Sequence, residues 1–181
     1  MDQARRSALR EAEATGAPAA LRQSVTPDGS SVSTLIDGLR IRPAVTQPDE
    51  RGTVTEIFDP RWQLDDKPLV YVYQVTIRPG QEKGWAMHKR QADRLFFAFG
   101  AMKIVLYDDR GESPTRGMLN EFVFGEERRA LVYVPPCVWH LVANVGQTDA
   151  MFLNCPTEPY SHEDPDKWLL PADTDLIPYR P

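Results

Sequence analysis

Histidine and cysteine are scarce in this 181-residue sequence, which contains three of the first and two of the second. Two cysteines, Cys137 and Cys155, cannot build the disulfide framework of a small secreted domain. Reduced thiols are the simpler interpretation, and a single bridge between them stays open. The sequence also lacks an apolar run long enough to span a bilayer, and its N-terminus is charged rather than signal-like. We therefore expect a soluble, cytoplasmic protein without a membrane partner.

An excess of positive charge is also missing, because the formal net charge is -5. This balance argues against nucleic-acid binding, but it leaves room for a local arginine cluster that binds one phosphorylated ligand. The length fits one domain, residues 35–181, preceded by a tail and linker, residues 1–34. The tail is rich in Ala, Arg, Glu and Leu, which predicts a short amphipathic helix near residues 4–13.

The rest of the chain alternates short apolar stretches with Gly/Pro turns. This pattern predicts an all-β fold, a cupin-like jelly-roll barrel behind the helical tail. A single helical turn is expected at residues 164–168. The expected strands are residues 36–42, 53–58, 69–77, 94–99, 102–107, 121–124, 130–134, 140–144 and 150–155.

Two of the three histidines lie in matched settings. His88 precedes Asp93 and a glycine, and His140 closes a Pro-Pro-Cys-Val-Trp-His segment. Two histidines on separate strands, each near a turn, suit a small barrel that points imidazoles into its own mouth. The second segment fits the downstream cupin motif with Cys137 in place of glycine. The first fits the upstream motif in part, because Arg90 stands where that motif has a second histidine.

Three further segments carry a family resemblance. They are Asp49-Glu50-Arg51-Gly52 followed by Glu56, the run from Asp108 to Gly117 that contains Ser-Pro-Thr, and Val134 to His140. From about Leu35 to the C-terminus the chain resembles the dTDP-4-dehydrorhamnose 3,5-epimerase family, a cupin-type group of nucleotide-sugar epimerases. The resemblance implies a homodimer, no metal, no cofactor, and proton transfer beside the ketone of a 4-keto-6-deoxy sugar.

The resemblance also implies roles for individual residues. His88 falls at the catalytic base, Asp173 is the candidate that orients it, with Asp175 as a rival, and His140 matches a second pocket histidine. Arg94 lies near the family's lysine at the enolate oxygen. The positions that match contacts to nucleotide or sugar are Arg51, Glu56 and Gln74, and Gln74 could complete the site of a neighbouring subunit.

Two departures from the family pattern bear on activity. Trp85-Ala86-Met87 precedes His88 where the family has an arginine, so Arg90 is the candidate substitute and Trp85 a candidate pocket wall. Asn154 stands near the family tyrosine that returns a proton to the substrate, and an amide has no titratable proton to give. Tyr160 and Tyr179 are nearby in sequence. Single epimerisation, isomerisation or another enolisation is therefore expected in preference to double epimerisation.

Four functions remain in competition. The first is a metal-free epimerase or isomerase of a nucleotide-linked keto sugar, and this is the one that the sequence favours. The second is an isomerase or cyclase that acts on a small molecule without a nucleotide. The third is a metal-dependent cupin oxygenase using His88, Asp93 and His140, against which the charge of Arg90 argues. The fourth is a cupin that binds a ligand without turnover.

Overall fold

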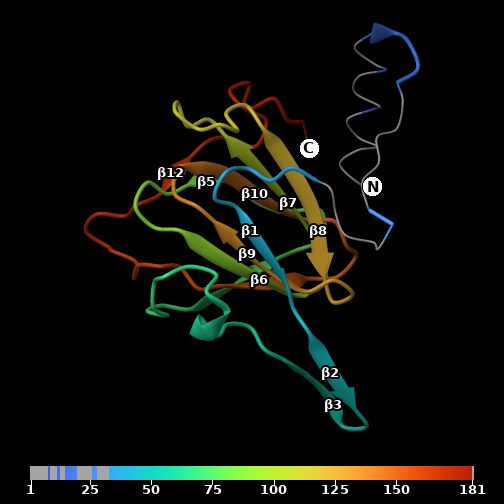
Figure 1. The fold of residues 1–181 in the computed structure, drawn as a ribbon, viewed down its shortest axis with the longest axis vertical. Coiled ribbons are helices and arrows are strands. Elements are labelled where there is room, and N and C mark those ends of the chain that lie inside the picture. The colour runs from blue at the N-terminus through green and yellow to red at the C-terminus, as the bar shows by residue number, and fades with distance from the viewer. Residues whose placement is uncertain (1–7, 9–11, 13–14, 20–25, 28–32, 181) are drawn as a thin grey trace.

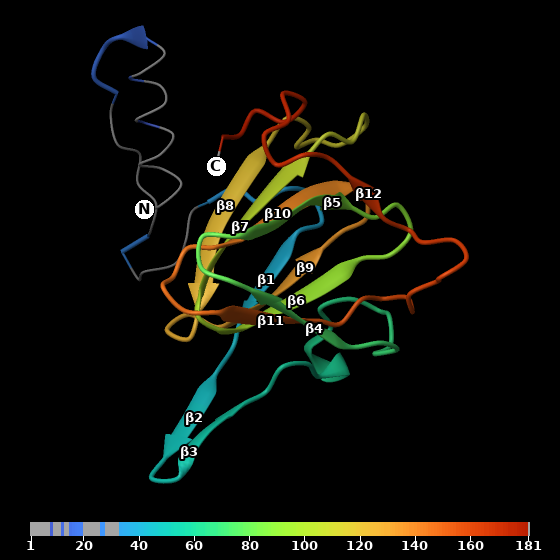
Figure 2. The ribbon, with the colours of Figure 1, turned by 180° about the vertical axis from the view of Figure 1, so that it is seen from behind.

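Two five-stranded antiparallel sheets pack face to face and form the barrel (Figure 1, Figure 2). The computed structural model describes residues 8, 12, 15–19, 26–27 and 33–180. The predicted all-β jelly roll is confirmed, whereas most of the expected N-terminal helix lies outside the described residues. No helix among those residues is long and apolar enough to cross a membrane.

Each sheet takes strands from distant parts of the chain. The first has the order β1 (Arg40–Pro43), β9 (Ala130–Val134), β6 (Asp93–Phe99), β11 (Ala150–Asn154) and β4 (Tyr73–Ile77). The second has the order β12 (Trp168–Leu169), β5 (Glu82–Met87), β10 (Val138–Asn144), β7 (Ala101–Asp108) and β8 (Leu119–Gly125). A hairpin of β2 (Thr46–Asp49) and β3 (Gly52–Thr55) extends away from the barrel, and one short 3-10 helix follows at Pro60–Trp62 (Figure 1).

The structure differs from the sequence-based expectation at several segments, and residues 36–39, 56–58 and 69–72 lie outside the strands that were expected to include them. The helical turn expected at residues 164–168 is wrong, because this stretch runs extended into β12, which pairs with β5. Strand β2 had not been expected, whereas β5, which leads directly to His88, agrees with the strand expected at the first histidine. The carboxylate of Asp166 explains the extended path: it accepts hydrogen bonds from the backbone N–H groups of Lys89, Arg90 and Gln91, which ties the late segment to the loop after β5.

Alternation along β6 shows how one strand serves both the core and the site. Phe97 points between the sheets and stacks on Phe124 of β8, with ring centroids 5.2 Å apart. Phe96, on the other face, packs under Leu64 and the segment that follows the hairpin. Because both faces of β6 are covered, all of its residues from Asp93 to Ala98 are buried.

The Ser-Pro-Thr segment is a structural turn. The fully buried carboxylate of Asp108 accepts hydrogen bonds from Arg110, Ser113 and Thr115. Burial acts to raise the pKa of this carboxyl, and these donors together hold it well below its usual range. Arg110 and Thr115 also bond the backbone of Asp37, so the turn fixes the start of the barrel.

Both cysteines are free thiols, which resolves the question that the sequence left open. Cys137 has a left-handed backbone conformation, with φ at 63°. Glycine adopts this conformation at little steric cost, which explains why the cupin motif has glycine at this place.

Gly84 allows β5 to approach β10 closely. A Cβ at this position would lie 2.7 Å from the Cα of Leu141 and 2.8 Å from the carbonyl oxygen of His140, and φ is +133°. We expect Gly84→Ala to lower the free energy of unfolding by about 2 kcal/mol, as overpacking does. Urea unfolding measures this, with Gly111→Ala as the control because Gly111 has nothing within 4 Å. Equal stability of the two variants would contradict the prediction.

Candidate active site

A pocket of about 440 Å³ lies between the two sheets. One wall comes from β5 and β10 of the second sheet, and the other comes from β4, β6 and β11 of the first. Alternate residues of each strand face the pocket, as the two-residue period of a strand requires. They include Tyr73 and Val75 on β4, Asp93 and Leu95 on β6, Phe152 and Asn154 on β11, and His140 and Val142 on β10.

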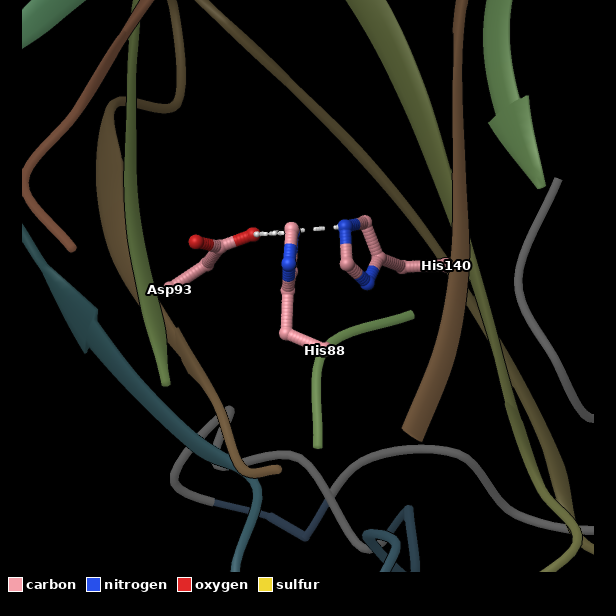
Figure 3. A group of neighbouring side chains, drawn as sticks. All are labelled: His88, Asp93 and His140. Carbon is pink, nitrogen blue, oxygen red and sulfur yellow. Dashed lines mark ion pairs between the residues drawn. The ribbon is translucent and has the colours of Figure 1, made fainter. Parts of the chain in front are cut away.

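Three side chains converge inside this pocket (Figure 3). The Oδ2 atom of Asp93 lies 3.3 Å from Nε2 of His88 and 3.3 Å from Nε2 of His140. His88 directly follows β5 and His140 lies on β10, so both imidazoles come from one sheet, while Asp93 comes from the other. All three are largely shielded from solvent, with side-chain exposures of 12%, 10% and 3% for His88, His140 and Asp93.

Neighbouring groups fix the orientation of these three side chains. Nδ1 of His88 contacts the carbonyl oxygen of Asp166, and Nδ1 of His140 lies 3.3 Å from the carbonyl oxygen of Val138. A carbonyl and a carboxylate only accept, so Nδ1 of each ring donates to its carbonyl, and Nε2 donates to Asp93 when the ring also carries a proton there. The far oxygen of Asp93, Oδ1, accepts amide hydrogen bonds at 3.0 Å from Gln91 and from Asn154.

This arrangement lowers the pKa of Asp93 and raises the pKa of His88. Burial acts to raise the pKa of Asp93, but hydrogen bonds and charge from His140 and His88 hold it well below its usual range, so the carboxylate stays ionised. Burial acts to lower the pKa of His88, but the hydrogen bond and charge of Asp93 and the carbonyl of Asp166 outweigh it and raise that pKa above 6.5. The negative charge therefore favours a proton on His88.

Three residues expected at the site lie elsewhere. Asp173 is exposed near the C-terminus, where its carbonyl accepts a hydrogen bond from an arginine, and the carboxylate beside His88 is Asp93. Asp175, the rival, is exposed and pairs with that same arginine. Trp85 is fully buried and packs edge-on against Tyr179 in a separate core cluster, so it does not line the pocket.

Arg94 also lies outside the pocket, because its neighbour Asp93 occupies the inward face of β6. The guanidinium is fully buried behind the sheet, where Nε and Nη2 donate to the two carboxylate oxygens of Asp65 at 2.7 and 2.5 Å. It also donates to the carbonyl oxygens of Lys67 and Pro68. Arg94 therefore holds the segment before β4 against β6 and does not reach the position expected at the enolate oxygen.

The residues expected to contact nucleotide or sugar divide into two groups. Arg90 and Asn154 line the pocket, and Arg90 donates to the carboxylate of Asp164 at 2.8 Å. Arg51 and Glu56 are exposed on and beside the hairpin, and Gln74 is exposed on the outward face of β4. These last three do not line the pocket of their own chain.

Tyr73 is a pocket residue that the sequence did not single out. Its hydroxyl accepts a hydrogen bond of 2.8 Å from the amide of Asn154. Of the two tyrosines considered from the sequence, Tyr160 lines the pocket and Tyr179 is buried in the core. The sequence did contain a signal, because Tyr71 and Tyr73 lie two residues apart on one predicted strand and therefore share a face. The strand that pairs with this one could not be identified from the sequence.

The same three side chains have the chemistry of a metal site. Among the described residues, His88, Asp93 and His140 offer ligand atoms that all lie within 4.8 Å of one another. Two imidazoles and one carboxylate suit Zn²⁺ or Fe²⁺, and carbonyl partners on Nδ1 are typical of metal-bound histidines. The contacts of 3.3 Å are close to the roughly 3.4 Å between ligands of a tetrahedral ion bound at about 2.1 Å.

We predict that Asp93→Asn lowers the pKa of His88 below that of the wild type. The neutral amide removes the charge that favours the imidazolium, which leaves burial as the dominant effect on this ring. Nuclear magnetic resonance titration of the imidazole measures the change. Asp164→Asn, which removes an exposed carboxylate from the same pocket, is the matched control. An unchanged His88 pKa in Asp93→Asn would contradict the assignment of Asp93.

Comparisons with known proteins agree with this fold. The chain is 34% identical over 140 residues to "Probable low-salt glycan biosynthesis epimerase Agl13" of Haloferax volcanii, which covers 76% of this chain and 89% of the relative. It is 29% identical over 146 residues to the spore coat polysaccharide biosynthesis protein SpsL of Bacillus subtilis, which covers 79% of this chain and 94% of that protein. No family model matches the chain.

A solved structure supports the same relationship. A dTDP sugar isomerase from Desulfovibrio desulfuricans superposes with a TM-score of 0.76 at 26% identity, covering 82% of this chain and 94% of the other. The long, nearly complete match to a curated sugar epimerase, together with the shared jelly roll, confirms the relationship that the sequence motifs indicated. This chain belongs to the dTDP-4-dehydrorhamnose 3,5-epimerase family of sugar epimerases.

Proposed function

We propose that the protein is an epimerase or isomerase that enolises the carbon beside the ketone of a nucleotide-linked 4-keto-6-deoxy sugar. The observation that carries this proposal is the convergence of His88 and His140 on the ionised carboxylate of Asp93 inside a pocket of about 440 Å³. A pocket of this size accommodates a small-molecule ligand.

His88 acts as the base in this mechanism. Neutral His88 takes the proton from carbon onto Nε2, and Asp93 stabilises the imidazolium that forms. The electron pair moves to the ketone oxygen and forms the enolate. Asp93 therefore replaces Asp173 in the proposed role of the orienting carboxylate.

Cationic side chains support a nucleotide-linked substrate. Lys83, Arg90 and Lys167 line the pocket, and Arg90 would exchange its exposed partner Asp164 for a pyrophosphate oxygen. The solved relative at 26% identity is described as a dTDP sugar isomerase, which suggests the same nucleotide here. The cytoplasmic location stays a prediction.

A second candidate function is metal-assisted enolisation or another metal-dependent cupin reaction. The spacing of the three ligand atoms favours it, and Arg90, whose charge argued against a metal, turns towards Asp164 at the pocket edge. A bound cation would occupy Nε2 of His88, so the metal-free base and the metal ligand are mutually exclusive roles for that atom.

Deuterium exchange tests the proposed function. We expect wild-type protein in D2O to introduce deuterium beside the ketone of dTDP-4-keto-6-deoxyglucose, and His88→Ala to slow this by at least about 100-fold. The wild-type rate should rise with pH through the raised pKa of His88, because only the neutral ring accepts a proton. Nuclear magnetic resonance of the sugar ring measures both effects.

His162→Ala is the matched control, because this histidine is exposed on a loop, does not line the pocket and forms an edge-on ring pair with Tyr160. Absence of exchange in wild type, with no ligand-induced shift, would exclude a nucleotide sugar and favour a substrate without a nucleotide. Ligand binding without exchange would indicate a non-catalytic cupin. Exchange that is lost after chelation and restored by Zn²⁺ or Fe²⁺ would favour the metal-dependent candidate.

We also propose a homodimer in which the exposed residues of one chain complete the site of the other. The hairpin extends beyond the barrel (Figure 1) and exposes Val54, while β4, an edge strand of its sheet, exposes Gln74. Unpaired edges are commonly covered by another chain. Light scattering should give twice the mass of 20.5 kDa, and a mixture of Arg51→Ala with His88→Ala should recover activity that neither variant has alone. A monomeric, active protein would contradict this arrangement.

A further inference from the structure

Tyr73 lies opposite Asn154 in the sheet that forms one wall of the pocket. Strands β4 and β11 pair in antiparallel register, and Asn154 is the direct partner of Tyr73. The phenol faces the pocket together with Val75, whereas Gln74 between them faces outward. A hydroxyl group from β4 therefore lies beside the Asn154 side chain in the pocket wall.

The ionised carboxylate of Asp93 determines which way the Asn154 amide points. One amide atom lies 3.0 Å from Oδ1 of Asp93 and 2.8 Å from the Tyr73 hydroxyl. A carboxylate only accepts, so this atom is the nitrogen, and its two protons go to Asp93 and to Tyr73. The phenol oxygen thus accepts a hydrogen bond from the amide.

The hydrogen bond from the Asn154 amide uses the oxygen of the Tyr73 hydroxyl and does not use its proton. Within the part of the chain that the structure describes, no acceptor for it is found, and the other amide atom, Oδ1 of Asn154, is likewise buried without a partner. Tyr73 as a residue is 38% exposed and lines the pocket, so the proton is available to a bound molecule.

Electrostatics keep that proton in place at neutral pH. Burial and the nearby charge of Asp93 raise the pKa of Tyr73 to about 12. The phenol is therefore fully protonated when the base His88 is partly neutral. An enolate carbon is a stronger base than a phenolate, so transfer of this proton to such a carbon is downhill.

The base and the phenol stand on opposite walls. His88 follows β5 and His140 lies on β10, both in the second sheet, whereas Tyr73 on β4 belongs to the first (Figure 2). A substrate held between the sheets therefore meets the imidazoles on one face and the phenol on the other. Inversion of a carbon centre requires this placement, because the proton leaves from one face and returns to the other.

We propose that Tyr73 is the catalytic acid that returns a proton to the substrate carbon, with Asn154 as the residue that positions its hydroxyl. This inference rests on the proposed function. The C–H bond breaks as His88 takes the proton, and its electron pair forms the enolate. A new C–H bond then forms on the opposite face as the O–H bond of Tyr73 breaks. The phenolate regains a proton from water, and His88 releases its proton to water.

Tyr73→Phe separates the two half-reactions. We expect the variant to retain deuterium exchange at the substrate carbon within a few-fold of wild type, because His88 is intact. Formation of the inverted sugar should fall by roughly 100-fold or more. Tyr133→Phe is the matched control, since Tyr133 packs in a core cluster and does not line the pocket. Both quantities are read from one nuclear magnetic resonance time course in D2O.

Several outcomes would overturn the assignment. If Tyr73→Phe forms the inverted product at a near wild-type rate, Tyr73 is not the acid, and the proposed function stands. If the wild type shows no exchange, both the proposed function and the role of Tyr73 are rejected. Equal loss of exchange and inversion would make Tyr73 a substrate-binding residue. If Tyr73→Phe fails to fold, 3-fluorotyrosine at position 73 keeps the hydroxyl with a lower pKa, and the loss of inversion at high pH must then move to lower pH. An unchanged profile would contradict the proposal.

Discussion

One buried carboxylate must remain ionised inside this barrel, and the site depends on how that is achieved. Asp93 is 3% exposed, and an unpaired carboxylate at such a depth would be strongly destabilised or neutralised. Two imidazoles satisfy one oxygen and two amides satisfy the other. The charge therefore specifies the positions of four side chains, two of which, His140 and Asn154, come from distant parts of the sequence, and it gives the pocket a fixed internal geometry.

The strand that carries Asp93 is held from both faces. Its next residue, Arg94, is fully buried on the opposite face and is paired with Asp65. Because successive side chains of a strand point to opposite faces, the negative charge of Asp93 and the positive charge of Arg94 lie on opposite sides of the sheet. Each charge is paired on its own side. Because replacing either partner leaves a buried charge unpaired, we infer that stability and site geometry are coupled along β6.

The sequence predicted the fold class, the family and the meeting of His88 with His140, because strand alternation, turns and short motifs are local signals. It could not place the orienting carboxylate, since Asp173 and its rival Asp175 lie on a C-terminal segment whose docking position is not a local signal. Arg94 was expected in the pocket, but a shift of one residue along a strand exchanges its two faces. Tyr73 was overlooked because its link to Asn154 exists only through the register of β4 against β11.

The proposed mechanism requires the sugar ring to lie between the imidazoles of one sheet and the phenol of the other. A crystal structure of the protein with a dTDP-linked 6-deoxy sugar tests it most directly. We predict that the carbon beside C4 lies within about 3.5 Å of Nε2 of His88 on one face and of the Tyr73 hydroxyl on the other. A sugar bound with both groups on the same face, or outside the pocket, would contradict the account, as would a metal ion seated on His88, Asp93 and His140.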